Sequence, residues 1–361
     1  MKLIRLSYKE EDWELENILF ESVSLIVGKN STGKSKTLTT IDLLGKILTQ
    51  KINLSPRVEW CIGIKSNKNE IITYTFRTSA NDEVEVIFEE VKIDDKVVLL
   101  RDNTEKAVVY NELDKKDEDI YPPTTKLAIH TNRDIKKYPY FEDIALWAEQ
   151  SYGFKFGNIS PDKPFSQQKY NLLTTVEEIP ELYKSLENET KSEIQKTIID
   201  NLKIIGFDIN ELFLIQVDSK SSYLFIREND VKSIIFFSNL SQGLFRCLSL
   251  LIFLEFLIAK RKPASIIIDD LCEGLDYERA TKLGKLVFDK CLENDIQLIA
   301  TSNDAFLMEA VDLKYWNVLQ RSGSVVTSIN HTTNPKLFED FKFTGLSNFD
   351  FFSSDYIAQK K

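Results

Sequence analysis

The chain has 361 residues, enough for about two domains, and its 43% hydrophobic and 11% aromatic content is ample for packed cores. Only 12 Gly and 9 Pro exclude a low-complexity or linker-dominated chain. The net charge of −10 favours a soluble protein and weighs against broad, sequence-independent attraction to DNA or RNA, although a local basic groove is compatible with it.

The cysteines, the histidines and the N-terminus bear on compartment and metal sites. Four scattered cysteines without a C-x-x-C pair are expected to be reduced, and two histidines nearly exclude a histidine-rich metal site. The first residues carry charge too early for a secretory signal. The most apolar run, Cys247 to Ala259, is too short to span a bilayer and contains Glu255, which predicts a core helix. A cytoplasmic protein without a membrane partner is expected.

The first third of the chain is predicted to be rich in strands. Apolar residues alternate over 2–8 and 18–28, which predicts two strand regions, and helical spacing predicts a helix over 35–51. Between Val58 and Val109, short apolar runs are separated by polar turn clusters. This pattern predicts an antiparallel meander.

The middle of the chain changes character. Residues 111–123 combine mixed charge with a Pro pair and are loop-like, whereas 126–131 are predicted to form a short strand. From about 141 to 206 the chain is predicted to be mostly helical, with Pro180 beginning one helix and Gly206 ending another.

The last third of the chain begins with strands and continues as a βαβ pattern. Three strands are predicted over 211–217, 222–228 and 233–237. A helix over 243–259 follows. A strand ending at Asp270, a helix over 278–294 and a strand over 297–302 then predict a parallel sheet.

The segment "GKNSTGKS", Gly28 to Ser35, fits the pattern G-x-x-x-x-G-K-S between a predicted strand and a predicted helix. Its glycines allow backbone N–H groups to surround phosphate oxygens, and the helix N-terminus favours negative charge. Lys34 is expected to reach the β- and γ-phosphates, and Ser35 offers a hydroxyl to Mg²⁺. These residues predict an ATP site.

Three further segments resemble the ATP-binding-cassette (ABC) type of ATPase. "LSQGL", Leu240 to Leu244, is similar to the family's L-S-G-G-Q signature, although Gln242 and Leu244 depart from it. "DDLCEGLD", Asp269 to Asp276, aligns without gaps with D-E-P-T-S-A-L-D. "LIATSND" places Asn303 where the family has its switch histidine.

The resemblance implies roles for these residues. Asp269 would hold Mg²⁺, Asp270 would stand for the catalytic glutamate and orient the attacking water, and Asp276 would lie in the D-loop that crosses a dimer interface. In that family the signature serine and its glycine amides grip the γ-phosphate of an ATP bound to another subunit, so two heads sandwich two ATPs head to tail. Because aspartate is one methylene shorter than glutamate, slow hydrolysis is expected.

Several of these residues have simpler alternative roles. Asn303 can donate a hydrogen bond to the γ-phosphate or can be a turn residue at a strand end, and Asp276 can be a helix N-cap. Arg246 fits a phosphate-facing cation or a surface charge. Trp13 and Phe20 precede the phosphate loop, where the family often stacks an aromatic ring on adenine, but core packing is the expected role for both.

Among branches of the family, stand-alone heads related to SMC, RecF and OLD-type proteins fit better than transporter subunits. A Q-loop glutamine is missing at the expected position, where Asn132, Arg133 and Asp134 stand instead. Long coiled coils and a nuclease domain are also missing, and everything after about Asn317 is read as a short tail. Such compact heads commonly work beside a separately encoded effector, often in bacterial defence against phage.

The sequence therefore predicts an α/β P-loop NTPase of ABC-ATPase type, with a mixed sheet, an antiparallel β subdomain and a helical insertion. The expected parts are an N-terminal ATPase half (1–140), the insertion (141–210), a C-terminal ATPase half (211–320) and a tail packing on the head (321–361). The expected function is a slow Mg-ATPase that dimerises head to tail and switches an effector. The alternatives are a DNA-repair head of the RecF/SMC kind and an ATP-stabilised scaffold without turnover.

The candidate residues fall into three sets. Catalytic roles are expected for Asp270, Lys34 and Asn303. Mg²⁺ ligands are expected to be Ser35 and Asp269. Nucleotide contacts are expected from Gly28, Lys29, Asn30, Ser31, Thr32, Gly33, Lys34, Ser35, Ser241, Gln242, Gly243 and Asp276.

Overall fold

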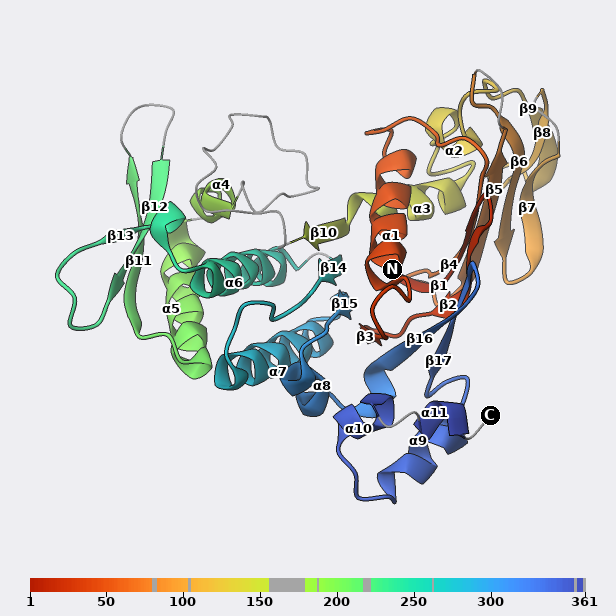
Figure 1. Ribbon diagram of the computed structural model, residues 1–361. Helices are drawn as coiled ribbons and strands as arrows, with labels where there is room; N and C mark the ends of the chain where they lie inside the picture. Colours follow the sequence, from red (N-terminus) through yellow and green to blue (C-terminus); the bar gives the residue numbers. More distant parts are fainter. Residues whose placement is uncertain are drawn as a thin grey trace. The chain divides into compact units, whose positions relative to one another are not determined.

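The computed structural model describes residues 1–79, 83–102, 105–155, 179–186, 188–216, 222–261, 263–353 and 356–359. The chain divides into two compact units, whose elements are labelled in Figure 1. The first unit comprises Met1–Ser151 and Lys314–Thr344, and the second comprises Tyr152–Leu313 and Gly345–Lys361. Each unit therefore combines two separate stretches of sequence.

The first unit is built around a mixed sheet with the strand order β3-β16-β17-β2-β1-β4-β5-β6-β7-β8-β9. β3 pairs with β16 and β2 with β17 in parallel, whereas β4 to β9 pair with their neighbours in antiparallel fashion. The strands are β1 Lys2–Glu10, β2 Trp13–Leu19, β3 Val23–Val27, β4 Val58–Lys65, β5 Ile71–Thr78, β6 Val86–Ile93, β7 Lys96–Arg101, β8 Ala107–Asn111, β9 Lys116–Ile120, β16 Trp316–Ser322 and β17 Val325–Asn330.

Strands β4 to β7 confirm the predicted meander, and aromatic rings pack along its buried face. The ring centroids of Tyr8 and Trp60 lie 4.6 Å apart, and those of Trp60 and Phe76 lie 5.2 Å apart. The loop expected over 111–123 is wrong in part, because it contains β9, which pairs with β8. Hydrogen bonds to β8 form this strand although "KDEDI" has poor β propensity, and charges are typical of an edge strand that must not pair further.

The C-terminal segment is more ordered than a tail. β16 and β17 form a hairpin inside the sheet of the first unit, and β17 also pairs with β2. Asn317 and Asn330 fix this register, since Asn330 Nδ2 donates to Asn317 Oδ1 at 2.9 Å and Asn317 Nδ2 donates to the Leu19 carbonyl at 2.8 Å. Helix α9 (Pro335–Lys342) follows.

The predicted helix after the phosphate loop is confirmed as α1 (Lys34–Leu48), which contacts α3 (Pro139–Glu149). The strand predicted over 126–131 is wrong: these residues include helix α2, Ala128–Thr131. The partners that hold α2 are distant in sequence, so no local pattern signals them.

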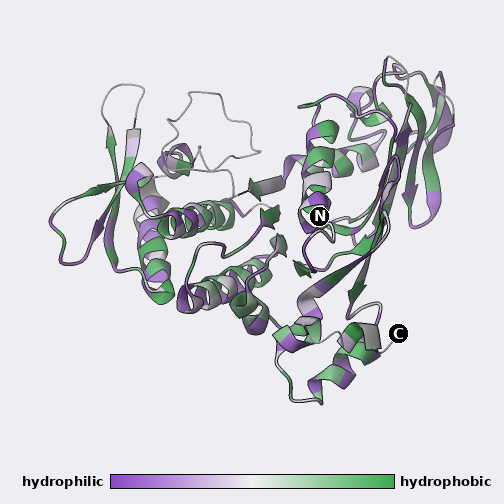
Figure 2. Cartoon of the chain, in the orientation of Figure 1, coloured by the Kyte–Doolittle hydropathy of each residue, from purple (hydrophilic) through white to green (hydrophobic). Residues whose placement is uncertain are grey.

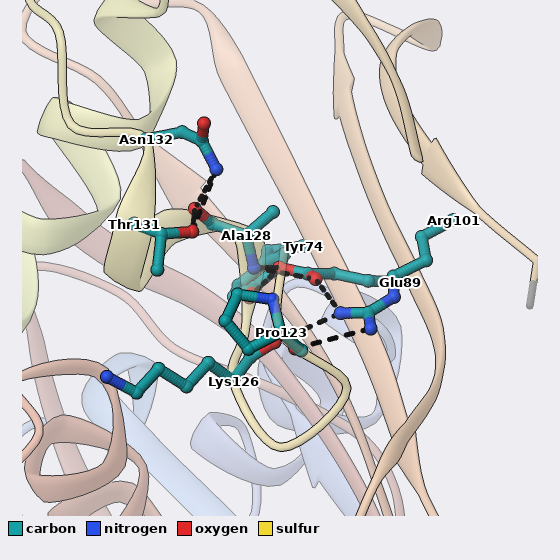
Figure 3. A network of polar contacts seen from close by, with 8 residues as sticks. All are labelled: Tyr74, Glu89, Arg101, Pro123, Lys126, Ala128, Thr131 and Asn132. Carbon is teal, nitrogen blue, oxygen red and sulfur yellow. Dashed lines mark hydrogen bonds and ion pairs between the residues drawn. The ribbon is translucent and has the colours of Figure 1, made fainter. Parts of the chain in front are cut away.

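A buried acid holds the first turn of α2 (Figure 3). The two carboxylate oxygens of Glu89 accept the Ala128 amide at 3.0 and 2.9 Å, and one of them accepts the Tyr74 hydroxyl at 2.7 Å. Arg101 Nη1 lies 3.9 Å from Glu89 and donates to the Lys126 carbonyl at 3.0 Å. Burial raises the pKa of Glu89 to about 7, although these bonds and the arginine oppose the rise.

The second unit surrounds helix α6 (Gln242–Lys260), which packs against α4 and α5, while α5 also contacts α7 (Figure 1). β14 and β15 pair in parallel with α7 between them in sequence, which confirms the βαβ prediction, and both are mostly green in Figure 2. The elements are β10 Ser151–Lys155, α4 Ile179–Lys184, α5 Asn188–Ile205, β11 Ile209–Gln216, β12 Ser222–Glu228, β13 Ile235–Phe236, β14 Ser265–Asp269, α7 Tyr277–Glu293, β15 Gln297–Thr301, α8 Ala305–Ala310, α10 Asn348–Ser353 and α11 Tyr356–Gln359.

The described part of the expected helical insertion contains α3, α4 and α5, together with β10. Pro180 is the second residue of α4, and Gly206 follows α5 with φ 110°, as predicted. The rest of the insertion, residues 156–178 and 187, lies outside the described residues.

Among the described helices, α6 alone is long and apolar enough to cross a membrane, but most of it is buried inside the protein. Its one acidic residue, Glu255, accepts hydrogen bonds from Lys290 Nζ at 2.7 Å and from Asn201 Nδ2 at 3.2 Å. These contacts join α6 to α7 and α5. The prediction of a buried core helix is confirmed.

Candidate nucleotide site

The phosphate loop connects β3 to α1 within the first unit. Lys34 is only 8% exposed, and its Nζ donates to the Gly28 carbonyl at 2.7 Å across the loop. Gly33 precedes the helix with φ 106°, and its carbonyl accepts the Thr37 amide at 2.8 Å. The ammonium therefore lies over the loop, within reach of phosphate oxygens that would replace the carbonyl as its partner.

Most of the loop's other predicted contacts face solvent. Thr32 is half-buried and donates to the Lys29 carbonyl at 2.8 Å, which closes the turn. The exposed members of the loop and the first turn of α1 are Lys29, Asn30, Ser31 and Ser35.

Trp13 lies against the phosphate loop, a position that the expectation of core packing did not anticipate. A Cβ on Gly33 would lie 3.1 Å from the Trp13 ring, a tight contact, and the φ of Gly33 also favours glycine at this position. The Arg321 guanidinium lies 4.8 Å from the centre of the same ring and donates to the Ser31 carbonyl at 3.1 Å. Phe20, by contrast, is buried in the core as expected.

In the second unit, the carboxyl ends of β14 and β15 bring the predicted acidic residues together. The Thr301 hydroxyl donates to Asp269 Oδ1 at 2.7 Å and accepts the Asp270 amide at 2.8 Å. Asn303 Nδ2 donates to Asp270 Oδ1 at 3.2 Å. Thr301 thus contacts the Asp269 carboxylate and the Asp270 backbone, while Asn303 contacts the Asp270 carboxylate. Thr301 is a site residue that the sequence analysis missed. Thr301 directly follows "LIA" at the carboxyl end of a predicted parallel strand, and this position could have identified it as a site residue.

The signature and the D-loop also lie together in the second unit. Ser241 is the N-cap of α6, with its side chain accepting the Leu244 amide at 3.4 Å. Asp276 is the N-cap of α7, as its alternative reading predicted. Its carboxylate accepts the Arg279 amide at 3.0 Å, and this bond, together with the guanidinium of Arg279, lowers the pKa of Asp276. Its side chain is 54% exposed, so it remains open to solvent.

Arg246 is buried and is not a surface charge. It is 6% exposed, and its Nη1 donates to the Glu273 carbonyl at 2.6 Å and to the Glu273 carboxylate at 3.1 Å. The surface-charge reading is therefore wrong, and the arginine joins the signature helix to the D-loop segment, whereas the phosphate-facing reading stays a prediction.

The nearest candidate for a Q-loop has a structural role. Arg133 donates to Glu142 at 2.9 and 2.7 Å and to Glu149 at 2.6 Å, which ties the segment after α2 to α3. Asn132 Nδ2 donates to the Ala128 carbonyl at 3.1 Å. These contacts hold the segment against α2 and α3.

Residues 23–309 match the family model described as "AAA domain, putative AbiEii toxin, Type IV TA system". The chain belongs to this AAA family. No curated protein matches its sequence.

Solved structures similar to this AAA-family chain include SMC heads. The crystal structure of an SMC head bound to the C-winged helix domain of ScpA is 13% identical with a TM-score of 0.52, covering 91% of this chain and 97% of that one. The SMC head domain from Thermotoga maritima is 12% identical with a TM-score of 0.48, covering 91% and 99%. The first likeness shows the fold alone, a mixed α/β fold like that of an SMC head.

The candidate metal ligands of this AAA-family chain, Ser35 and Asp269, carry oxygen donors of the kind that suits Mg²⁺. Within the described ranges, no cluster of three His, Cys, Asp or Glu side chains could hold a metal ion. Mg²⁺ typically takes one or two protein oxygens and completes its shell with substrate phosphates and water. The Ser35 hydroxyl and the Asp269 carboxylate are oxygen donors of that kind.

Proposed function

We propose that the chain is an Mg-ATP-dependent ATPase switch that dimerises head to tail and controls a separate effector protein in the cytoplasm. The observation that carries the proposal is the acidic edge of the second unit. There, Thr301 orients Asp269, and Asn303 holds Asp270. In this proposal Ser35 and Asp269 hold Mg²⁺, Lys34 binds the β- and γ-phosphates, and Asp270 orients the attacking water.

Exposed side chains next to the D-loop support dimerisation. Tyr277 and Phe306 are 60% and 44% exposed, and their rings pack edge to face with centroids 4.6 Å apart. Tyr277 follows Asp276 directly, and Phe306 follows Asn303 by three residues. Exposed paired aromatics are typical anchors of protein interfaces. A second copy of the chain is the proposed occupant, and its Ser241 would then approach the phosphate bound here.

The effector and the role in phage defence rest on the resemblance to compact stand-alone heads and on the family match. The similar SMC head binds ScpA, another protein, through its head domain. A DNA-repair head of the RecF/SMC kind is the second candidate, and the SMC-like fold favours testing it. It predicts ATP-dependent DNA binding with a steep salt dependence.

The decisive experiment is sedimentation of the full chain with and without Mg-ATP, for the wild type and for Asp270→Asn, alongside phosphate release. We expect an ATP-dependent doubling of mass that is longer lived in Asp270→Asn, which should release phosphate much more slowly. Lys34→Ala should abolish nucleotide binding. Lys46→Ala, the same change in the last turn of α1, is the matched control and should bind normally.

Each outcome decides a different part of the proposal. If neither the wild type nor Asp270→Asn gains mass with ATP, the head-to-tail dimer is wrong. Dimers without phosphate release would favour the scaffold alternative, and retained binding in Lys34→Ala would contradict the phosphate-loop assignment. Retention of duplex DNA at low salt that requires ATP would support the DNA-repair alternative instead.

A further inference from the structure

The buried arginine Arg246 connects two segments of the second unit. It lies in the second turn of α6, five residues after Ser241, and points to the loop that follows β14. One guanidinium nitrogen donates both to the backbone carbonyl and to the side chain of Glu273, at 2.6 and 3.1 Å. The arginine is 6% exposed whereas the Glu273 side chain is 52% exposed, so solvent screens the carboxylate and the bond to the backbone carbonyl is the better shielded of the two.

The same two segments also approach each other closely at Gly243. A Cβ on Gly243 would lie 2.8 Å from Leu275 Cδ2 and 3.2 Å from the Gly274 carbonyl. The first turn of α6 therefore packs at Gly243 directly against the Leu275 side chain and the Gly274 backbone. The arginine bonds and this close approach join the two segments. Because close-packed protein interiors have low compressibility, a displacement of one segment is transmitted to the other.

The loop continues the connection to the candidate catalytic carboxylate. The Glu273 amide donates to the Asp270 carbonyl at 3.1 Å, so residues 270–273 form a tight turn. Asp270 itself has a left-handed backbone, with φ 54°, and its carboxylate accepts Asn303 Nδ2 at 3.2 Å. A continuous hydrogen-bonded path thus runs from Arg246 through Glu273 to Asp270 and Asn303.

We propose that Arg246 is a positioning residue that makes the signature and the D-loop move as one block, so that binding of phosphate at Ser241 sets the orientation of Asp270. The proposal rests on the proposed ATPase function. It assigns Arg246 no contact with ATP. Its action is through Glu273, whose carbonyl and carboxylate it holds, and a displacement of about 1 Å at a reacting group can cost about 100-fold in rate.

The test compares Arg246→Met, Arg246→Lys and Glu273→Ala in the full chain, measuring kcat for ATP hydrolysis and the Kd of Mg-ATP. Arg246→Met should lower kcat roughly 10- to 100-fold. The Kd should stay within about threefold of the wild type, because the phosphate loop is untouched. Arg246→Lys keeps one donor and should recover part of kcat. Glu273→Ala leaves the backbone acceptor, so its kcat should lie between those of the wild type and Arg246→Met.

The control is Arg261→Met, the same change at the exposed far end of α6, which should leave kcat and Kd unchanged. Unchanged kcat in Arg246→Met, or equal losses of kcat and of ATP affinity, would overturn the proposal. If Arg246→Met does not fold, kcat values of Arg246→Lys and Glu273→Ala equal to the wild type would overturn it as well.

A second measurement separates failure of this proposal from failure of the ATPase function. If the wild type hydrolyses no ATP, the proposed function fails, and amide exchange then decides the coupling alone. The amides of Leu275 and Asp276 should exchange about tenfold faster in Arg246→Met, or in Glu273→Ala where that variant does not fold. The last turns of α6 should be unaffected. Equal exchange in the variant and the wild type would overturn the coupling.

Discussion

Replacing Glu89 with glutamine should change how the stability of the first unit depends on pH. Glutamine has nearly the same shape and keeps an oxygen that can accept the Tyr74 hydroxyl and the Ala128 amide, so the packing around α2 is preserved (Figure 3). It cannot ionise. The substitution therefore removes the titration of a buried carboxyl and little else, apart from the charge that faces Arg101.

The magnitude follows from the raised pKa. Burial moves the pKa of Glu89 from its ordinary value of 4.5 to about 7, against the Ala128 and Tyr74 hydrogen bonds and the charge of Arg101. Between these values the unfolded chain binds fewer protons at this site than the folded protein, so wild-type stability falls as pH rises. Each tenfold change in proton affinity is worth about 1.4 kcal/mol, which gives a loss of about 3 kcal/mol between pH 4 and 8.

The assay is urea unfolding of the wild type and Glu89→Gln at several values between pH 4.5 and 8. The quantity to plot is the difference in unfolding free energy between the two proteins. His130, whose pKa burial lowers to about 4, destabilises the fold as pH falls, but it is present in both proteins and cancels in the difference. The variant should gain about 3 kcal/mol relative to the wild type across this range. Parallel curves would refute the reasoning.

Three further changes test the packing and the nucleotide site. Glu255→Ala leaves Lys290 without its carboxylate and should cost about 3 kcal/mol in urea unfolding, whereas Glu255→Met with Lys290→Met should recover most of it. Gly33→Ala should weaken Mg-ATP binding strongly in calorimetry, because a φ of 106° strains alanine and its Cβ would press on the indole ring of Trp13 at 3.1 Å. Gly345→Ala, with φ 69° and open space, should bind normally. Trp13→Ala should weaken Mg-ATP binding about tenfold if the base stacks on this ring, and unchanged affinity would contradict that role.

Features set by local sequence could be predicted. The phosphate loop is a short run whose glycines and lysine act within eight residues, and α1 follows it as expected. Likewise, β14, α7 and β15 are defined by runs of apolar residues with the periods of a strand and a helix, and parallel pairing places Asp270 and Asn303 at one edge. The fold class followed from this order of motifs and is confirmed.

Features set by distant partners could not be predicted. α2 depends on a carboxylate from β6, and the charged strand β9 depends on its pairing with β8. β16 and β17 pair with β3 and β2 from the start of the chain. The sequences of β2 and β3 do not indicate which later segments pair with them. Arg246 was ambiguous for the same reason, because its acceptor lies in a loop 27 residues away.

The backbone at Asp270 gives a physical reason for the shorter acid at the position of the family's glutamate. With φ 54°, this residue occupies a left-handed conformation that aspartate and asparagine adopt more readily than longer side chains. The conformation is held on both sides, since the Asp270 amide donates to Thr301 and its carbonyl accepts the Glu273 amide. The short side chain of Asp270 tolerates this turn and is held in place by it. The position of the Asp270 carboxylate therefore depends on the position of the turn. Control of the turn by Arg246 would then control hydrolysis more strongly here than in a head with a longer, more adaptable glutamate.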